Sequence, residues 1–240
     1  MKVEIVDPQT FDETAAQQAI SQIEVKSNSR IGFATGNTTV GLHHVLADTI
    51  NNQKVCIDKI AVYNLDEYVG LSQENPLSCF YRMKNQLYNR IGLSPQQINF
   101  LDGDTLDPSA ECQRFEESIR NSGGIDLQFV GIGLNGHIGF NEPHTPFEST
   151  THVINIDLTS RTSRVSDFGS LEKVPAQGIT MGIKTIMMCR KIVLLAKGKH
   201  KAEIVKKALL GPVTTEVPAS ILQLHPNITV ILDQEAAELL

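Results

Sequence analysis

Four side chains that can hydrogen-bond or transfer a proton lie close together in the run VGIGLNGHIGFNEP, residues 130–143. They are Asn135, His137, Asn141 and Glu142. The run follows an apolar strand pattern at Asp126–Val130, and glycine-rich loops at strand ends commonly carry the site of an α/β sheet. An imidazole beside a carboxylate can shuttle protons near neutral pH. The segment therefore predicts a loop that does acid–base chemistry.

The same run contains the letters of a dinucleotide-binding fingerprint, with Gly131, Gly133 and Gly136 in GxGxxG spacing and Asp157 about 20 residues later. That fingerprint requires a helix to open at the third glycine. The following residues, HIGFNEP, are interrupted by a further glycine and a proline, so we reject a dinucleotide cofactor.

A second constellation, ATGNTT at residues 34–39, lies between a predicted strand and a predicted helix. Gly36 frees the backbone to bend, and Thr35, Thr38 and Thr39 supply hydroxyl donors. Unpaired N–H groups and the positive end of the helix dipole favour an anion at this position. The alternative is that Thr38 only caps the helix.

The third constellation is YNLDEYVGL, residues 63–71, where two adjacent acids follow a strand end. Neighbouring strand side chains point in opposite directions, so only one of Asp66 and Glu67 is expected to face a shared crevice as a base. The alternative is a pair of solvated acids in a loop.

Three basic residues are candidates for binding an anion. Lys201 lies in the first turn of a predicted helix, where the dipole disfavours a cation, so a facing anion would explain it. Arg161 and Arg164 lie in Asp157–Lys173, the least regular segment, which is interpreted either as a mobile lid or as a surface loop. An ordinary solvated surface is the alternative for all three.

The elements that position these residues alternate between short apolar strands and longer helices. Strands are predicted at Lys2–Val6, Arg30–Ala34, Lys59–Asn64, Ile98–Leu101, Asp126–Ile132, Val153–Ile156, Ile192–Ala196 and Ile228–Leu232. Helices are predicted at Phe11–Val25, Thr39–Asn51, Pro76–Ile91, near Pro108–Arg120, Pro175–Met188 and Lys199–Leu210. This alternation predicts an α/β fold, a three-layer α/β/α sandwich with a mostly parallel, Rossmann-like sheet and a lid at about 157–173.

Composition narrows the class of protein. The formal net charge is −6 among 240 residues, which argues against a nucleic-acid surface. Four scattered cysteines without CxxC spacing suggest reduced thiols in the cytoplasm. The absence of a signal-peptide pattern or an 18-residue apolar run argues against export and membrane insertion. No linker-like stretch divides the chain, so a single domain over residues 1–240 is expected.

Taken together, the motifs resemble the glucosamine-6-phosphate deaminase family. TGNTT, NLDEYVGL, GLNGHIGFNEP, ITMGIKTI, GKHKA and LQLHP occur in the family's order over nearly the whole chain. The resemblance implies conversion of glucosamine 6-phosphate and water to fructose 6-phosphate and ammonium in amino-sugar catabolism. It implies no metal and no organic cofactor, and a sugar phosphate as the only ligand of the site.

The resemblance also implies roles for individual residues. Asp66 is similar to the base that moves the C2 proton toward C1, and His137 to the residue that opens the pyranose ring, supported by Glu142 and Asn135. The match to the phosphate site comprises Thr35, Gly36, Asn37, Thr38 and Lys201, with Arg164 as the lid arginine.

The chain departs from the family pattern at two places. Some members have Asp at the position of Asn135, so here only Glu142 can stabilise an imidazolium. Members commonly have Asn-Ser/Ala-Arg-Phe-Phe in the lid, whereas this chain has RTSRVSDF at residues 161–168, which leaves Arg161 and Arg164 as alternatives.

Two competing functions follow from the same motifs. A sugar-phosphate lactonase or isomerase would share the phosphate loop and a glycine-rich GHxA/G run, but is not expected to carry LDEYVGL. A sugar-phosphate sensor would need a DNA-binding domain, for which a strand beginning at residue 2 leaves no room. We expect a monomer or small homo-oligomer. The resemblance also implies that allosteric members carry basic residues after GFNEP and a C-terminal extension. Thr150–Ile154 has no Arg or Lys and the chain ends soon after its last strand, so we expect no allosteric activation.

Overall fold

The structure, a computed structural model, describes residues 1–240 and is built on a seven-stranded parallel sheet. The order across the sheet is β1-β10-β9-β6-β2-β3-β5. The strands are β1 (Lys2–Val6), β2 (Arg30–Phe33), β3 (Ala61–Asn64), β5 (Ile98–Asn99), β6 (Leu127–Gly131), β9 (Ile192–Ala196) and β10 (Ile228–Asp233). All adjacent pairs run parallel. The predicted α/β class and mostly parallel sheet are confirmed.

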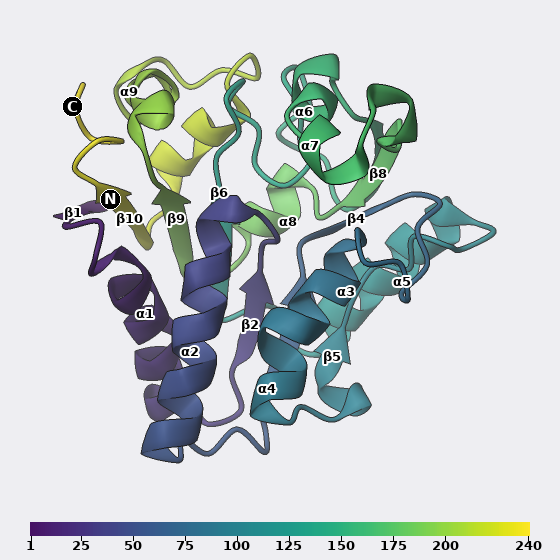
Figure 1. The fold of residues 1–240 in the computed structure, drawn as a ribbon, viewed down its shortest axis with the longest axis vertical. Coiled ribbons are helices and arrows are strands. Elements are labelled where there is room, and N and C mark those ends of the chain that lie inside the picture. The colour runs from purple at the N-terminus through teal and green to yellow at the C-terminus, as the bar shows by residue number, and fades with distance from the viewer.

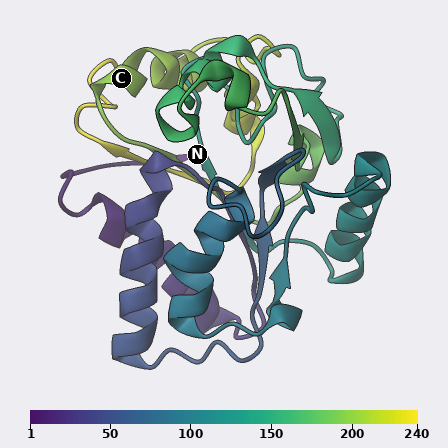
Figure 2. The ribbon, with the colours of Figure 1, turned by 45° about the vertical axis from the view of Figure 1, so that its right-hand side comes forward.

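Helices cover both faces of this sheet (Figures 1 and 2). One face carries α1 (Phe11–Val25), α2 (Val40–Gln53), and α3 (Cys79–Met83) continued through a π-helical turn into α4 (Asn89–Ile91); the other carries α5 (Pro108–Asn121), α8 (Ile183–Met187) and α9 (Ala202–Leu210). Successive strand residues supply the two cores in turn. Phe129 of β6 belongs to the first cluster and Val130 to the second, and both are fully buried.

A second, three-stranded antiparallel sheet was not predicted. It consists of β4 (Asp66–Tyr68), β8 (Gln177–Thr180) and β7 (His152–Asn155), in that order. The predicted helix Pro175–Met188 is therefore wrong in its first half, since only α8 is helical. Gly182 lies between β8 and α8 and is the residue that precedes the helix. Only glycine fits there, since a Cβ would lie 2.1 Å from two backbone carbonyl oxygens.

The predicted lid is more regular than its sequence suggested. It contains α6 (Leu158–Thr162), α7 (Val165–Phe168) and a 3₁₀ turn at Leu171–Lys173. Asp157 caps α6 by accepting the Thr159 N–H at 2.8 Å. In Figure 1 these short helices lie above α3, beyond the arrowhead of β2. The arrowhead marks the carboxyl end of the strand, so the lid lies at the carboxyl edge of the sheet. No helix in the structure has the length and apolar character needed to cross a membrane.

Candidate active site

A cavity of about 370 Å³ opens at the carboxyl ends of the central strands, beneath the lid. This volume falls within the usual range for small-molecule sites. Nine of the ten predicted site residues line it: Thr35, Gly36, Asn37, Thr38, Asp66, Asn135, His137, Arg164 and Lys201. The tenth, Glu142, lies directly behind His137. Segments far apart in the sequence thus meet in one place.

The loop after β2 forms one wall of the cavity. It turns through a 3₁₀ turn at Asn37–Thr39 into α2, and Thr39 secures the turn. Its Oγ1 accepts the Gly36 N–H at 3.1 Å and donates to the Ala34 carbonyl at 2.9 Å. The alternative in which Thr38 caps the helix is therefore wrong. Thr38 instead lines the cavity, and the 14-residue helix α2 begins beside it. The start of a helix next to a polar loop is a geometry that suits an anion.

Two cations face this loop. The Arg164 Nη2 atom lies 3.8 Å from the point where a Cβ on Gly36 would stand, so the guanidinium approaches the loop from the lid. Lys201 precedes α9 and donates from Nζ to the Ile132 carbonyl at 2.7 Å. Burial lowers the pKa of Lys201, and the neighbouring charge of Arg164 lowers it further. An anion held between them would relieve this repulsion.

The other lid arginine is used differently. Arg161 also borders the cavity, but its Nη2 donates to the carbonyls of Leu171 at 3.0 Å and Val174 at 2.9 Å. Those bonds hold the lid's own turns together. Between the two arginines that the sequence left open, Arg164 is the one whose guanidinium reaches the loop after β2, at Gly36.

The paired acids after β3 divide as the strand alternation predicts. Asp66 lines the cavity, and its buried Oδ1 has no hydrogen-bond partner within the protein. The Glu67 carboxylate turns the other way and accepts three backbone N–H groups, from Tyr68 at 2.7 Å, Cys79 at 3.0 Å and Phe80 at 2.9 Å. Both acids are buried, so the alternative of solvated loop residues is wrong.

The environment of Asp66 suits a base that works near neutral pH. Burial raises the pKa of Asp66 to about 7, and the adjacent Glu67 charge contributes in the same direction. Burial likewise raises the pKa of Glu67 to about 7, against the pull of its backbone donors. A carboxyl group whose pKa lies near 7 can both accept and return a proton during one catalytic cycle.

His137 is held by Glu142 and Asn135. Its Nδ1 lies 3.2 Å from Glu142 Oε2, and its backbone N–H donates to Asn135 Oδ1 at 3.2 Å. Asn135 Nδ2 donates to the same Glu142 oxygen at 2.7 Å. Burial alone would raise the pKa of Glu142, but these donors outweigh it and hold that pKa below its usual value. An aspartate at position 135 could not donate to Glu142, so the amide has a positive structural role.

Two glycines make room for this arrangement. A Cβ on Gly133 would lie 2.3 Å from the His137 ring, so only glycine lets the imidazole fold back over the loop. Gly139 has φ +60°, and a Cβ there would lie 2.6 Å from Thr180 Oγ1. Of the glycines in the GxGxxG spacing, Gly133 therefore serves to pack the loop against His137, whereas a Cβ on Gly131 would meet no atom within 4 Å.

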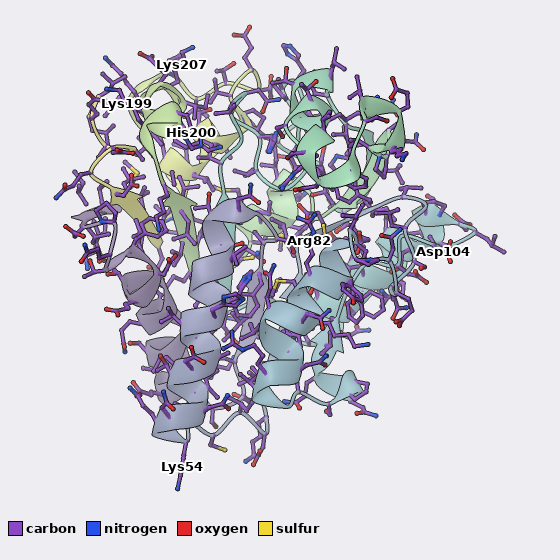
Figure 3. The ribbon with its side chains drawn as sticks, viewed as in Figure 1. Lys54, Arg82, Asp104, Lys199, His200 and Lys207 are labelled. Carbon is purple, nitrogen blue, oxygen red and sulfur yellow. The ribbon has the colours of Figure 1, made fainter.

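The cavity lining also includes residues that the sequence analysis did not single out, among them Cys79, Arg82 and Ser160. Burial raises the pKa of the Cys79 thiol well above its usual value. Arg82 lies at the top of α3 below the lid (Figure 3), and its Nη2 contacts Asp167 of α7 at 3.2 Å. Ser160 of α6 contacts His137. Their contacts depend on the tertiary arrangement, and no local pattern signals them. No group of three or more His, Cys, Asp and Glu side chains is placed to hold a metal ion.

Comparison with known proteins relates this geometry to a family. The family model for glucosamine-6-phosphate isomerases and 6-phosphogluconolactonases matches residues 8–231. A glucosamine-6-phosphate deaminase of Clostridium botulinum is 43% identical over 238 residues, which cover 99% of this chain and 98% of the relative. One from Clostridium acetobutylicum is 44% identical over 241 residues, covering 99% and 100%.

Solved structures agree with the sequence relatives. The structure described as a monomeric glucosamine-6-phosphate deaminase superposes with a TM-score of 0.97 at 38% identity, covering 100% of both chains. A 6-phosphogluconolactonase of Thermotoga maritima superposes with a TM-score of 0.77 at 18% identity, covering 97% of this chain and 98% of that one, which shows a shared fold alone. This chain belongs to the glucosamine-6-phosphate isomerase and 6-phosphogluconolactonase family.

Proposed function

We propose that the protein is a glucosamine-6-phosphate deaminase, converting glucosamine 6-phosphate and water to fructose 6-phosphate and ammonium. The observation that carries the proposal is one cavity that combines an anion loop, a free buried carboxylate and an oriented histidine. Curated relatives bearing that name at 43–44% identity over the full chain support it.

Phosphate anchoring is assigned to the loop after β2 and the two cations opposite it. Thr35, Gly36, Asn37 and Thr38 supply hydroxyl, amide and backbone donors, while Lys201 and Arg164 supply charge. Fixing the phosphate converts binding energy into orientation of the distant C1 and C2 atoms, which lowers the entropy cost of the proton transfers.

Ring opening is assigned to His137. His137 borders the cavity; its Nδ1 faces Glu142, and its Nε2 has no hydrogen-bond partner in the protein. With the proton on Nδ1, a neutral imidazole can take the O1 proton at Nε2 and return it to O5 as the C1–O5 bond breaks. Glu142 then stabilises the imidazolium that exists between the two transfers.

Isomerisation is assigned to Asp66. As a carboxylate it removes the C2 proton of the open-chain amino-aldose and delivers a proton to C1, forming the ketose-side imine through an enolamine. Water then adds at C2 and ammonium leaves, giving fructose 6-phosphate. A single carboxylate on one face of the substrate suffices for transfer between adjacent carbons, and Asp66 is the only buried acid of the pair that faces the cavity.

The test is release of ammonium from glucosamine 6-phosphate by the purified protein, with fructose 6-phosphate measured in parallel. The proposal requires both products in a 1:1 ratio without added metal or cofactor. The competing activity is hydrolysis of 6-phosphogluconolactone, which removes no proton from carbon and releases no ammonium. Lactone hydrolysis without ammonium release would replace the proposed function.

Cellular setting and assembly follow from the same proposal. All four cysteines are free thiols, which suits the reducing cytoplasm. The solved relative at 38% identity is described as monomeric. We therefore propose a cytoplasmic monomer, and sedimentation of the purified protein at the mass of one 26.4 kDa chain would support it.

A further inference from the structure

The lid contributes a hydroxyl to the histidine. Ser160 Oγ lies 3.1 Å from His137 Nδ1, the nitrogen that also faces Glu142 at 3.2 Å. Ser160 is buried although it lies on a five-residue helix at the molecular surface. A hydrogen bond from Ser160 also helps to hold the pKa of Glu142 below its usual value.

A second contact ties the same helix to the same carboxylate. The Asp157 backbone N–H donates to Glu142 Oε1 at 3.2 Å, and the Asp157 side chain caps α6. The two oxygens of Glu142 thus receive donors from both sides, the glycine-rich loop through Asn135 and the lid through Asp157. The position of α6 and the geometry of the His137–Glu142 pair are mechanically linked.

The Ser160 hydroxyl is free for this task. Ser163, on the same lid segment, bonds back to the Ser160 carbonyl at 2.7 Å, as helical serines commonly do. Ser160 makes no such bond within its own helix and turns inward instead. Thr162, two residues further on, is exposed and makes no side-chain hydrogen bond.

These contacts define the protonation of the ring. The partner of one imidazole nitrogen sets which nitrogen carries the proton. Glu142 is acceptor-only when ionised, and Ser160 can accept from Nδ1 while donating to Glu142. The combination favours the Nδ1–H form and leaves Nε2 unprotonated toward the cavity.

We propose that Ser160 is a positioning residue that couples the lid to His137. The Nδ1–H tautomer, the one that opens the sugar ring, is then favoured when α6 packs against His137 and Glu142. The inference rests on the proposed function for its catalytic consequence. Placement of the lid would then do more than exclude water, because it would complete the base that acts on the sugar ring.

The kinetic test compares Ser160→Ala with Ser160→Thr and with Thr162→Ala, a control on the same helix. For Ser160→Ala we expect kcat on glucosamine 6-phosphate to fall about 10-fold, the size of one lost hydrogen bond to a charged group, with KM unchanged within about twofold. Ser160→Thr keeps the hydroxyl and should recover most of the rate. Thr162→Ala should match the wild type.

The spectroscopic test reads the tautomer directly. Protein labelled with ¹⁵N at histidine gives the protonation state of each ring nitrogen, and the His137 signals are assigned as those missing in His137→Gln. We expect Nδ1 protonated in the wild type and in Ser160→Thr, and a shift toward the Nε2–H form in Ser160→Ala. Thermal unfolding of each variant controls for loss of the fold.

The outcomes separate the inference from the proposed function. A wild-type His137 spectrum in Ser160→Ala overturns the inference whatever the rate, and so does an unchanged kcat or an equal loss in Thr162→Ala. If the wild type releases no ammonium at all, the proposed function fails, while the ¹⁵N spectra still decide whether Ser160 sets the tautomer.

Discussion

At the residue scale, the division of labour between Asp66 and Glu67 carries the chemistry. They are adjacent and both buried, yet one has a free oxygen in the cavity and the other accepts three backbone amides. Strand alternation alone predicts that only one of them faces the crevice. The family resemblance implies that Asp66 is the base. Two of the three backbone donors that fix Glu67 come from α3, 12 and 13 residues away, where no local pattern marks them.

The first prediction concerns Asp66→Asn. Loss of a positioned base costs about 10²–10⁴-fold in kcat, and KM should change little because the phosphate contacts remain. Steady-state ammonium release and a binding titration with substrate measure the two quantities. Near-normal deamination by Asp66→Asn, together with an inactive Glu67→Gln, would reverse the assignment.

The second prediction is a pH profile. Burial and the Glu67 charge raise the pKa of Asp66 to about 7, so the carboxylate form of the base is lost as the pH falls through that value. The kcat/KM of the free enzyme should therefore drop below about pH 7. Glu67→Gln removes the neighbouring charge and should move this acid limb to lower pH. An acid limb that stays fixed in Glu67→Gln would contradict the coupling.

The third prediction concerns His137→Gln. If His137 opens the ring, the variant should be slow on the cyclic substrate and should still bind the open-chain analogue 2-amino-2-deoxyglucitol 6-phosphate with wild-type affinity. Isothermal titration gives the affinity, and exchange of the C2 proton with solvent reports the later step. Failure to exchange that proton in substrate already opened would move His137 to the isomerisation step.

At the element scale, the lid is fastened to α3 by charge. The Asp167 carboxylate of α7 accepts a hydrogen bond from Arg82 of α3 at 3.2 Å, which joins the lid to α3. The same carboxylate lies 3.5 Å from Arg164, the arginine that faces the loop after β2. The side chains of Arg82 and Asp167 are 23% and 28% exposed, which keeps the expected effect modest.

The fourth prediction tests this fastening with a double-mutant cycle. Arg82→Met and Asp167→Asn should each raise KM by about 2–5-fold. The double variant should be no worse than Asp167→Asn alone, because that change already removes the contact with Arg82. Arg90→Met is the matched control, since its ion pair with Asp48 at 2.7 Å joins α4 to α2. Additive effects of the two changes would show that Arg82 and Asp167 act independently.

Long, periodic elements were predictable, and short non-local ones were not. The helix Phe11–Val25 and strand Ile192–Ala196 were predicted with the bounds that the structure gives. The strand Gln177–Thr180 was placed in a helix, because its partners, Asp66–Tyr68 and His152–Asn155, are remote in sequence. Ser160 was missed for the same reason, since its role depends on where the lid lies.

At the scale of the whole molecule, the structure bears on regulation. The strand β7 (His152–Asn155) is an edge of the small sheet and carries no Arg or Lys. An effector phosphate bound there would lack charge, and the coupling free energy of about 1–3 kcal/mol that regulation requires would lack a source.

The fifth prediction follows. Saturation curves for glucosamine 6-phosphate should be hyperbolic with and without N-acetylglucosamine 6-phosphate, which steady-state assays at several concentrations of both sugars can measure. Sigmoidal kinetics that become hyperbolic on addition of the acetylated sugar would instead reveal a basic effector site elsewhere.

The position of β1 has a consequence for biosynthesis. Its only neighbour in the sheet is β10, and Lys2 pairs with Thr229. At about 5–20 residues per second, a ribosome needs roughly 10–45 s to travel between those two codons. Throughout that interval the first strand made has no partner, with Val3 and Ile5 exposed even in the finished fold. β1 can therefore join the sheet only after β10 has been made, whereas β2, β3 and β6 can pair long before release.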